Sequence, residues 1–234
     1  MKLISTLLFS LLIGICTAQT SQVPPISMRF QNGPYGLIAE LPLAPPRVLG
    51  NHYLYTEWNS ATIYLNDDME IEQIPIRIDL ENQHIEIMHS EVIKVLSFSK
   101  IKAIDIMKTH GTKEHFMNGE SFIFAGDKVK GLFKVIVSGK FSLILNTHTE
   151  VISSTYNKAL DVGTRDAQVQ QSHQYYILKD RTVVKVGNNK SKLADIIREV
   201  YKQDASDIIR KAKLKDEQSL VSMINALNEI SELD

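Results

Sequence analysis

The stretch Ile74-Pro75-Ile76-Arg77-Ile78-Asp79-Leu80 decides the fold class of this chain, because apolar and polar residues alternate along it with a period of two. In a β-strand, that period places every second side chain on the same face. The proline cannot donate a hydrogen bond to a neighbouring strand, so the strand begins near it or lies at a sheet edge. The expected faces are Ile76, Ile78 and Leu80 buried on one side, with Arg77 and Asp79 on the other.

The same alternation extends in both directions, from Ala61 to Val186, around short polar turns at Asn66–Asp68, Glu81–Gln83 and Ser138-Gly139. Strands joined by short turns form an antiparallel meander, since parallel strands need long crossover connections. One face of such a sheet is commonly exposed to solvent. Further strands are predicted around Ile63 and Leu65 and at Ile85–Ile87, Ile101–Met107, Ser121–Phe124, Leu132–Val137, Phe141–Leu145, Tyr175–Leu178 and Val183–Val186.

Two polar segments interrupt this pattern. Residues 19–49 are rich in proline, glutamine and serine and are predicted to be an extended lead-in with one strand at Leu37–Leu41. Asn146–Gln174 is predicted to be a long loop, and loops of this length inside a domain are usually functional or ordered by packing.

After Gly187 the apolar period becomes helical. Three helices are predicted, the first capped by Asn189 or Ser191 and the third by Asp216. Their apolar stripes are expected to pack on one another, while packing on the sheet is left open. These stripes are Leu193, Ile196, Ile197, Val200 and Tyr201; Ile208, Ile209 and Ala212; and Leu220, Met223, Ile224, Leu227 and Ile230.

The expected fold is therefore α+β: an antiparallel β meander, as a curved sheet or partial barrel, followed by a C-terminal helical tail. The predicted organisation is a signal peptide at 1–18, the lead-in at 19–49, a β-rich domain at 50–187 and the helical tail at 188–234.

The first eighteen residues have the three parts of a secretory signal peptide: Lys2, the apolar run Leu3–Cys16, and small residues at the end of Cys16-Thr17-Ala18. The run is too short to span a bilayer, which needs about 20 residues. We expect cleavage before Gln19 and a periplasmic, cell-surface or extracellular location. Ile15 argues against lipidation of Cys16, because a lipobox has a small residue there.

Composition excludes several classes of partner and site. Cys16 is the only cysteine, so the mature chain has no disulfide and no thiolate site. The formal net charge is −1, and no basic stripe of the kind that nucleic-acid binding requires is present. The basic stretch Arg210–Lys215 is interpreted as a solvated helix face. After the signal, no apolar run is long enough to be a transmembrane segment.

The sequence predicts no catalytic, cofactor-binding or metal-binding residue. His84 and His89 are expected on opposite faces of a strand, and His110 and His115 in a loop flanking Glu114, without a zinc-binding frame. The acidic cluster Asn66–Glu72 lacks the register of a calcium loop and is interpreted as an Asx turn.

Neither a serine-hydrolase elbow nor a glycine-rich phosphate loop is present, and no carboxylate pair stands out among the many candidates. Tyr53, Tyr55 and Trp58 form an aromatic group before the first long strand. They either plug one end of the β core, which we favour, or contact a glycan or protein.

Several segments, in order, resemble uncharacterised exported β-rich proteins of Bacteroidetes-type bacteria. The likeness covers most of Gly50–Leu227 and implies a β-rich exported fold with a helical tail, and no activity. The segments are Tyr53-Leu54 with Glu57-Trp58, Ile63–Leu65, Pro75–Leu80, Leu132–Lys140, Tyr156–Gly163 and Tyr175–Leu178.

Two functions follow from these observations. The favoured function is that of an exported cell-envelope protein that is not an enzyme. It either binds a partner, such as an envelope protein, a lipid or a glycan, or has a structural role. The alternative is a hydrolase of envelope glycans or peptides that uses carboxylates which the sequence does not identify.

Overall fold

The computed structural model describes residues 39–40, 50–108, 111–152, 162 and 168–231. The predicted signal peptide, most of the lead-in and His110 lie outside these residues. The strands are β1 (Ala39–Glu40), β2 (Asn59–Leu65), β3 (Glu70–Asp79), β4 (His84–His89), β5 (Val92–Ser97), β6 (Ile101–Met107), β7 (Lys113–Asn118), β8 (Ile123–Phe124), β9 (Leu132–Val137), β10 (Ser142–Ile152), β11 (Gln168–Lys179) and β12 (Thr182–Lys185). The helices are α1 (Lys190–Tyr201), α2 (Ser206–Lys211) and α3 (Glu217–Ser231), with short 3-10 turns η2 (Phe98–Lys100) and η3 (Gly119–Ser121).

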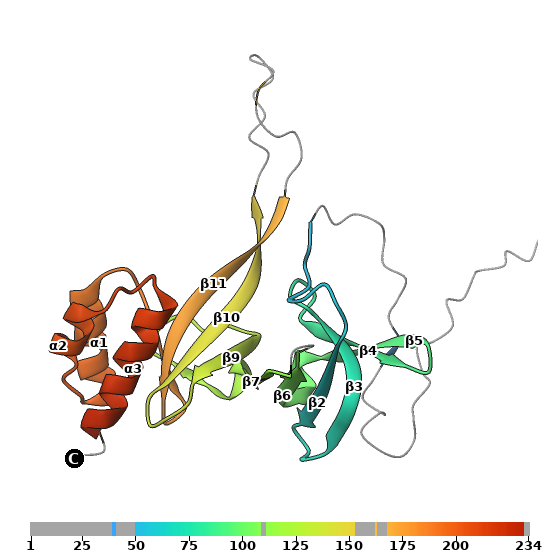
Figure 1. Cartoon of the computed structure of the whole chain (residues 1–234), viewed down its shortest axis with the longest axis horizontal. Helices are drawn as coiled ribbons and strands as arrows, with labels where there is room; N and C mark the ends of the chain where they lie inside the picture. Colours follow the sequence, from blue (N-terminus) through green and yellow to red (C-terminus); the bar gives the residue numbers. More distant parts are fainter. Residues whose placement is uncertain (1–38, 41–49, 109–110, 153–161, 163–167, 232–234) are drawn as a thin grey trace, which may run out of the picture.

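The described strands form one open sheet in the order β1-β5-β4-β3-β2-β6-β7-β9-β10-β11-β12-β8 (Figure 1). Neighbouring strands are antiparallel except for the parallel pair β12 and β8. The predicted α+β class, with an antiparallel meander followed by a helical tail, is confirmed. The helices lie beside β9–β11, whereas β2–β5 lie at the other end of the molecule (Figure 1).

The N-terminal half of the sheet has an apolar core on one face. Ile76 and Ile78 are 1% and 2% exposed, and Leu80 packs against the same cluster, as the alternation predicts. The cluster's described members come mainly from β2–β7, so this half surrounds its own core without help from α1–α3. The fully buried members include Ile63, Leu65, Ile85, Ile87, Leu96, Ile101 and Ile104.

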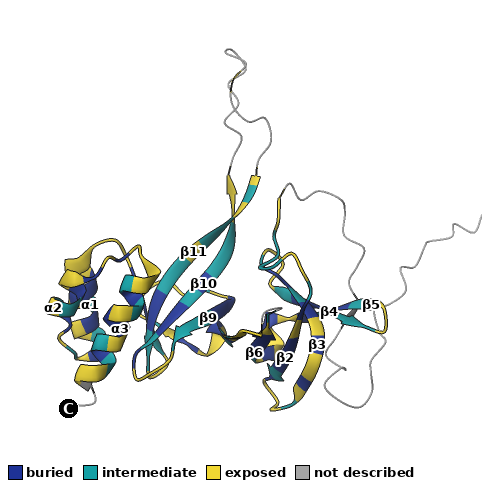
Figure 2. Cartoon of the chain, viewed as in Figure 1, coloured by how far each residue is buried: buried dark blue, intermediate teal, exposed yellow. Residues whose placement is uncertain are grey.

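The C-terminal half of the sheet buries both faces. On one face, Leu143 and Ile177 join the helices in a cluster that includes Leu193, Ile197 and Leu220. The opposite face carries an aromatic cluster of Phe122, Phe133 and Tyr176 with Ile144 and Val183. Figure 2 shows that exposed residues gather on the outward sides of the helices and towards the far end of β10 and β11.

The tail is bonded to the sheet as well as packed on it. The Asn228 side chain accepts a hydrogen bond from the Phe141 N–H at 2.7 Å and donates one to the Phe141 carbonyl at 2.9 Å. The Tyr201 hydroxyl donates to the carbonyl oxygens of Ile177 and Thr182, at 2.6 and 3.0 Å. A Cβ at Gly139 would collide with Asn228, so glycine allows this close approach. Packing on the sheet, which the sequence left open, is therefore part of the fold.

The expectation about the second polar segment is corrected. Asn146–Gln174 is not a loop at its ends, because β10 continues to Ile152 and β11 begins at Gln168. The two strands pair along their whole described length, from Ser142 opposite Leu178 to Ile152 opposite Gln168. The ladder supplies backbone hydrogen bonds to residues that no core covers.

None of the described helices is long and apolar enough to cross a membrane.

Candidate functional site

The face of β2–β7 opposite the apolar core, called the outer face below, carries two clusters of ionisable side chains. Arg77 pairs with Glu86, and Asp79 with His84, across β3 and β4. Asp105 pairs with His115 across β6 and β7. These pairs follow from strand alternation, because their neighbours along each strand point into the core.

The first cluster centres on Asp79, which is only 2% exposed. Its Oδ1 accepts the Asn82 backbone N–H at 2.8 Å, and its Oδ2 accepts the Asn82 side-chain amide at 2.9 Å. The same Oδ2 lies 3.5 Å from Nε2 of His52 and 3.7 Å from Nε2 of His84. Two imidazoles thus approach one buried carboxylate oxygen, at distances longer than a normal hydrogen bond.

Glu86 lies beside this carboxylate and is 1% exposed. Its Oε2 accepts hydrogen bonds from Nη2 and Nε of Arg77 at 2.6 and 2.9 Å, and its Oε1 accepts the Tyr53 hydroxyl at 2.8 Å. The Arg77 guanidinium also stacks on the rings of Tyr53 and Trp58, 3.8 and 4.9 Å from their centroids. Burial, together with the Glu86 hydrogen bond, raises the pKa of Tyr53 to about 12, so this hydroxyl remains a donor.

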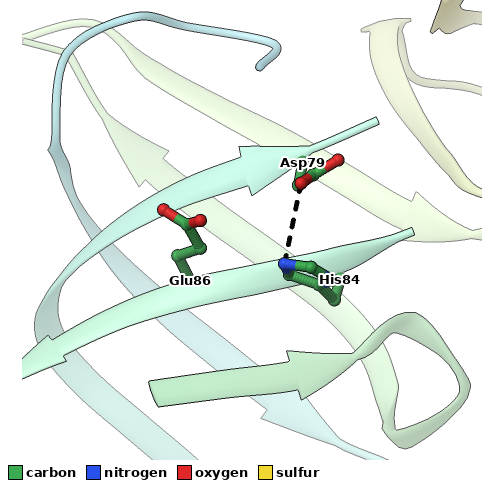
Figure 3. Close-up of side chains that lie close together, drawn as sticks. All are labelled: Asp79, His84 and Glu86. Carbon is green, nitrogen blue, oxygen red and sulfur yellow. Dashed lines mark ion pairs between the residues drawn. The ribbon is translucent and has the colours of Figure 1, made fainter. Parts of the chain in front are cut away.

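Asp79, His84 and Glu86 are close enough to share a metal ion. Each offers one ligand atom, and these atoms lie within 4.8 Å of one another. In Figure 3 the three side chains come from the two paired strands, with the dashed line joining Asp79 to His84. Among the described residues, Nε2 of His84 and Nδ1 of His52 are buried nitrogens that make no hydrogen bond.

The second cluster centres on Asp105, which is 9% exposed. Its carboxylate accepts the Tyr64 hydroxyl at 2.8 Å, lies 2.8 Å from the Lys113 ammonium, and lies 2.6 Å from Nδ1 of His115. Burial acts to raise the pKa of Asp105, but the hydrogen bonds from Lys113, His115 and Tyr64 outweigh it and lower that pKa. Tyr64 and His115 also line a surface pocket of about 360 Å³ with Asp68, Glu70 and Lys102.

A third carboxylate, Glu114, lies on the core side of β7. It accepts hydrogen bonds from the Tyr55 hydroxyl and from Nζ of Lys134, the latter at 2.6 Å. Burial opposes ionisation of Glu114, but these two donors lower its pKa. The Lys108 ammonium lies 3.2 Å from the centre of the Tyr55 ring. This group ties the segment before β2 to β7 and β9.

Several candidate residues behave as the sequence predicts and one does not. His84 and His89 are the two ends of β4, with odd spacing that puts them on opposite faces. His115 lies on β7 rather than in a loop, which corrects that prediction. Asn66–Asp68 is a turn, in which the Asp67 carboxylate accepts the Met69 N–H at 3.3 Å.

The aromatic group fits the interpretation as a plug of the β core only in part. Leu54 and Tyr55 pack against the N-terminal core, as a plug at one end would. Tyr53 and Trp58 instead cover the Arg77 guanidinium on the outer face.

The hairpin of β10 and β11 extends beyond the rest of the sheet (Figure 1). Strand β9 pairs with β10 only as far as Asn146. The part of the hairpin beyond Asn146, residues 147–152 and 168–173, is called the arm. Within the described residues, its bridges and hydrogen bonds to the segment before β2 come from β11. There Gly50 bridges Val169, and the Gln171 amide donates to the Tyr53 carbonyl at 2.7 Å.

No protein-family model, no curated protein and no solved structure matches this chain. Function is therefore inferred from the chemistry and geometry of the chain itself.

Proposed function

We propose that this chain is an exported cell-envelope protein that acts by binding another protein through the outer edge of β10 in the arm. Export is supported by the signal-peptide pattern of residues 1–18 and by the resemblance to exported proteins. The observation that carries the binding role is the open edge of residues 147–152, which the described strands leave without a partner.

An open strand edge presents backbone donors and acceptors that another strand can pair with, and proteins usually protect such edges with lysine, proline or a bulge. The edge Thr147-His148-Thr149-Glu150-Val151-Ile152 contains neither lysine nor proline, and Glu150 is its one acidic residue. Its register against β11 is regular throughout, so no bulge disrupts it. Threonine, valine and isoleucine favour extended backbone. This edge is suited to accept a strand.

The side chains at the end of the arm favour a protein as the partner. Val151 is 67% exposed and Ile152 is 45% exposed. Strand addition obtains affinity from main-chain hydrogen bonds and specificity from side chains that alternate along the edge. A glycan or lipid headgroup would satisfy the backbone groups less completely, because it does not repeat donor and acceptor with strand spacing.

The test is photocrosslinking from position 149 in the producing cells, followed by identification of the adduct. We expect one dominant protein adduct in the wild type. The edge variant Val151→Lys should lose it, because a charged lysine on an open edge opposes pairing. The matched control Gln170→Lys, an exposed site on β11, should retain it.

Equal adducts in both variants, or an adduct with a second copy of this chain alone, would contradict the proposal.

Mass measurement of the same native protein tests export separately: cleavage before Gln19 is expected, and an intact Met1 would refute export.

The hydrolase alternative now has a specific candidate. A carboxylate that fixes one imidazole nitrogen leaves the other for a substrate, which is the usual arrangement of a general base. Asp105 holds Nδ1 of His115 at 2.6 Å, and His115, 44% exposed, lines the pocket beside Tyr64. In this second proposal, His115 is the base and Asp105 orients it.

Incubation with purified peptidoglycan and with a mixture of fluorogenic peptides tests this alternative. Release of product by the wild type, abolished in His115→Ala and retained in His148→Ala, would support hydrolysis. No release by the wild type, or equal release by the two variants, would refute the role of His115.

A further inference from the structure

We propose that Asp79, His84 and Glu86 bind a zinc ion on the outer face of β3 and β4. This site is separate from the arm and from the pocket beside His115, and it does not depend on either proposed function. The inference rests on three observations: the distances between the donor atoms, the unbonded Nε2 of His84, and the groups that hold the carboxylates.

The distances fit ligands around a metal better than they fit ion pairs. Ligand atoms placed 2.0–2.1 Å from zinc at the corners of a tetrahedron lie about 3.3 Å apart. Oδ2 of Asp79 lies 3.7 Å from Nε2 of His84. A direct hydrogen bond from a histidine to a carboxylate is shorter, as Asp105 and His115 show at 2.6 Å on the same face.

The imidazole of His84 supplies the second observation. Nε2 of His84 is buried and makes no hydrogen bond within the described part of the chain, although it faces a carboxylate. A buried polar atom without a partner is destabilising, so such an atom calls for an explanation. A bound cation would use this lone pair and bring the nitrogen and the oxygen together without a shared proton.

The carboxylates are held in place by other groups, as ligands in metal sites usually are. The Asn82 backbone and amide fix both oxygens of Asp79, while Arg77 and Tyr53 fix those of Glu86. A carboxylate accepts about four hydrogen bonds or ligands, so each still has capacity for a metal ion. The side chains of Asp79 and Glu86 are 3% and 2% exposed, which keeps competing water away.

The set of donors selects the metal. Imidazole nitrogen suits zinc, copper, nickel and iron, whereas magnesium and calcium prefer oxygen ligands alone. One imidazole and two carboxylates, with no thiolate, form a set of three protein ligands that zinc accepts, with a water molecule completing its four-coordinate geometry. The Arg77 charge next to Glu86 leaves the cluster less negative than its two carboxylates alone, which disfavours a hard cation held mainly by charge.

The experiment is calorimetric titration of the metal-free mature protein with zinc alone. We expect one equivalent to bind. His84→Ala and Asp79→Asn should each weaken binding by more than roughly tenfold, because loss even of an outer-shell partner costs that much. Asp79→Asn keeps an oxygen to accept the Asn82 N–H, and the unfolding temperature of each metal-free variant checks its fold.

The matched control is His115→Ala, which removes the other histidine that contacts a carboxylate on the outer face. It should bind zinc like the wild type. X-ray absorption of the zinc-loaded wild type needs no variant and should show scattering from an imidazole ligand. No binding, oxygen-only coordination, or equal loss of affinity in His115→Ala and His84→Ala would overturn the site.

Discussion

The two halves of the sheet differ in what lies on the second of their two faces. In the C-terminal half, the helices cover one face and the aromatic cluster around Phe133 covers the other. In the N-terminal half, one face is an apolar core and the other carries Arg77, Asp79, Glu86 and Asp105. Strand alternation is common to both halves, so alternation alone does not tell whether a second face is used for packing or for polar chemistry.

The comparison teaches where function is expected. In the C-terminal half, apolar residues cover both faces of the sheet. These side chains serve stability, because a ligand cannot reach them. The outer face of the N-terminal half holds buried charges instead, and buried charges are costly unless they are paired. Their retention there favours this half, together with the arm, as the functional part of the molecule.

Removing the tail should have the largest effect. Deletion of residues 188–234 uncovers the face that Leu143, Ile177 and Val184 share with the helices. We expect an aggregated product, because an exposed apolar patch of this size drives association. Soluble yield and light scattering measure it. A soluble fragment with an unchanged unfolding temperature would show that the two halves do not differ in this way.

A charge on the core side of the N-terminal half should come next. Ile78→Asp places a carboxylate among Ile76, Ile85 and their neighbours, and should cost several kcal/mol of unfolding free energy. The control Ser60→Asp puts the same charge at an exposed position of β2 and should change stability little. Urea unfolding compares the two. Similar losses in both variants would contradict the assignment of faces.

Much of the fold was predictable where burial and alternation agree. The bounds of β6 and β9 match the predicted strands, and Asn189 caps α1 as expected, accepting the Lys192 N–H at 3.1 Å. Strand β7 was missed because its core-facing position 114 is a glutamate, which removes the apolar alternation. The turn before β5 was missed because Ser90 and Glu91 adopt positive φ without glycine or asparagine.

The smallest expected effect is on how the stability of the folded chain depends on pH under acidic conditions. The pKa values of Asp105 and Glu114 are lowered in the folded chain, so the unfolded chain binds more protons at acidic pH. Their stabilisation is therefore present above the ordinary carboxyl values of about 3.9 and 4.3 and is lost as the pH falls through the lowered values.

Asp105→Asn and Glu114→Gln should each be less stable than the wild type at neutral pH and lose less on acidification. Thermal unfolding between neutral and acidic pH measures this difference. As a control, Glu120→Gln changes an exposed carboxylate and should leave the pH dependence of stability as in the wild type. Parallel curves for all four proteins would contradict the assigned pKa shifts.

The candidate metal site was only partly accessible from the sequence. The predicted hairpin places Asp79 and His84 on either side of a short turn, and strands that pair across such a turn bring these two residues face to face. His52, which lies beside this site, could not be assigned in the same way, because it reaches Asp79 through a segment with little regular structure before β2. The arm was missed because Thr147–Glu150 has no apolar period.

The two hydrogen bonds between the Asn228 side chain and the Phe141 backbone have a consequence for the order in which the chain folds during synthesis. Asn228 follows Phe141 by 87 residues, so β10 cannot acquire its final contacts until that stretch has been translated. If the chain is exported as we propose, this delay is useful, because a polypeptide threaded through a secretion channel must not fold first. The last helix would then complete folding only after the earlier strands have crossed the membrane.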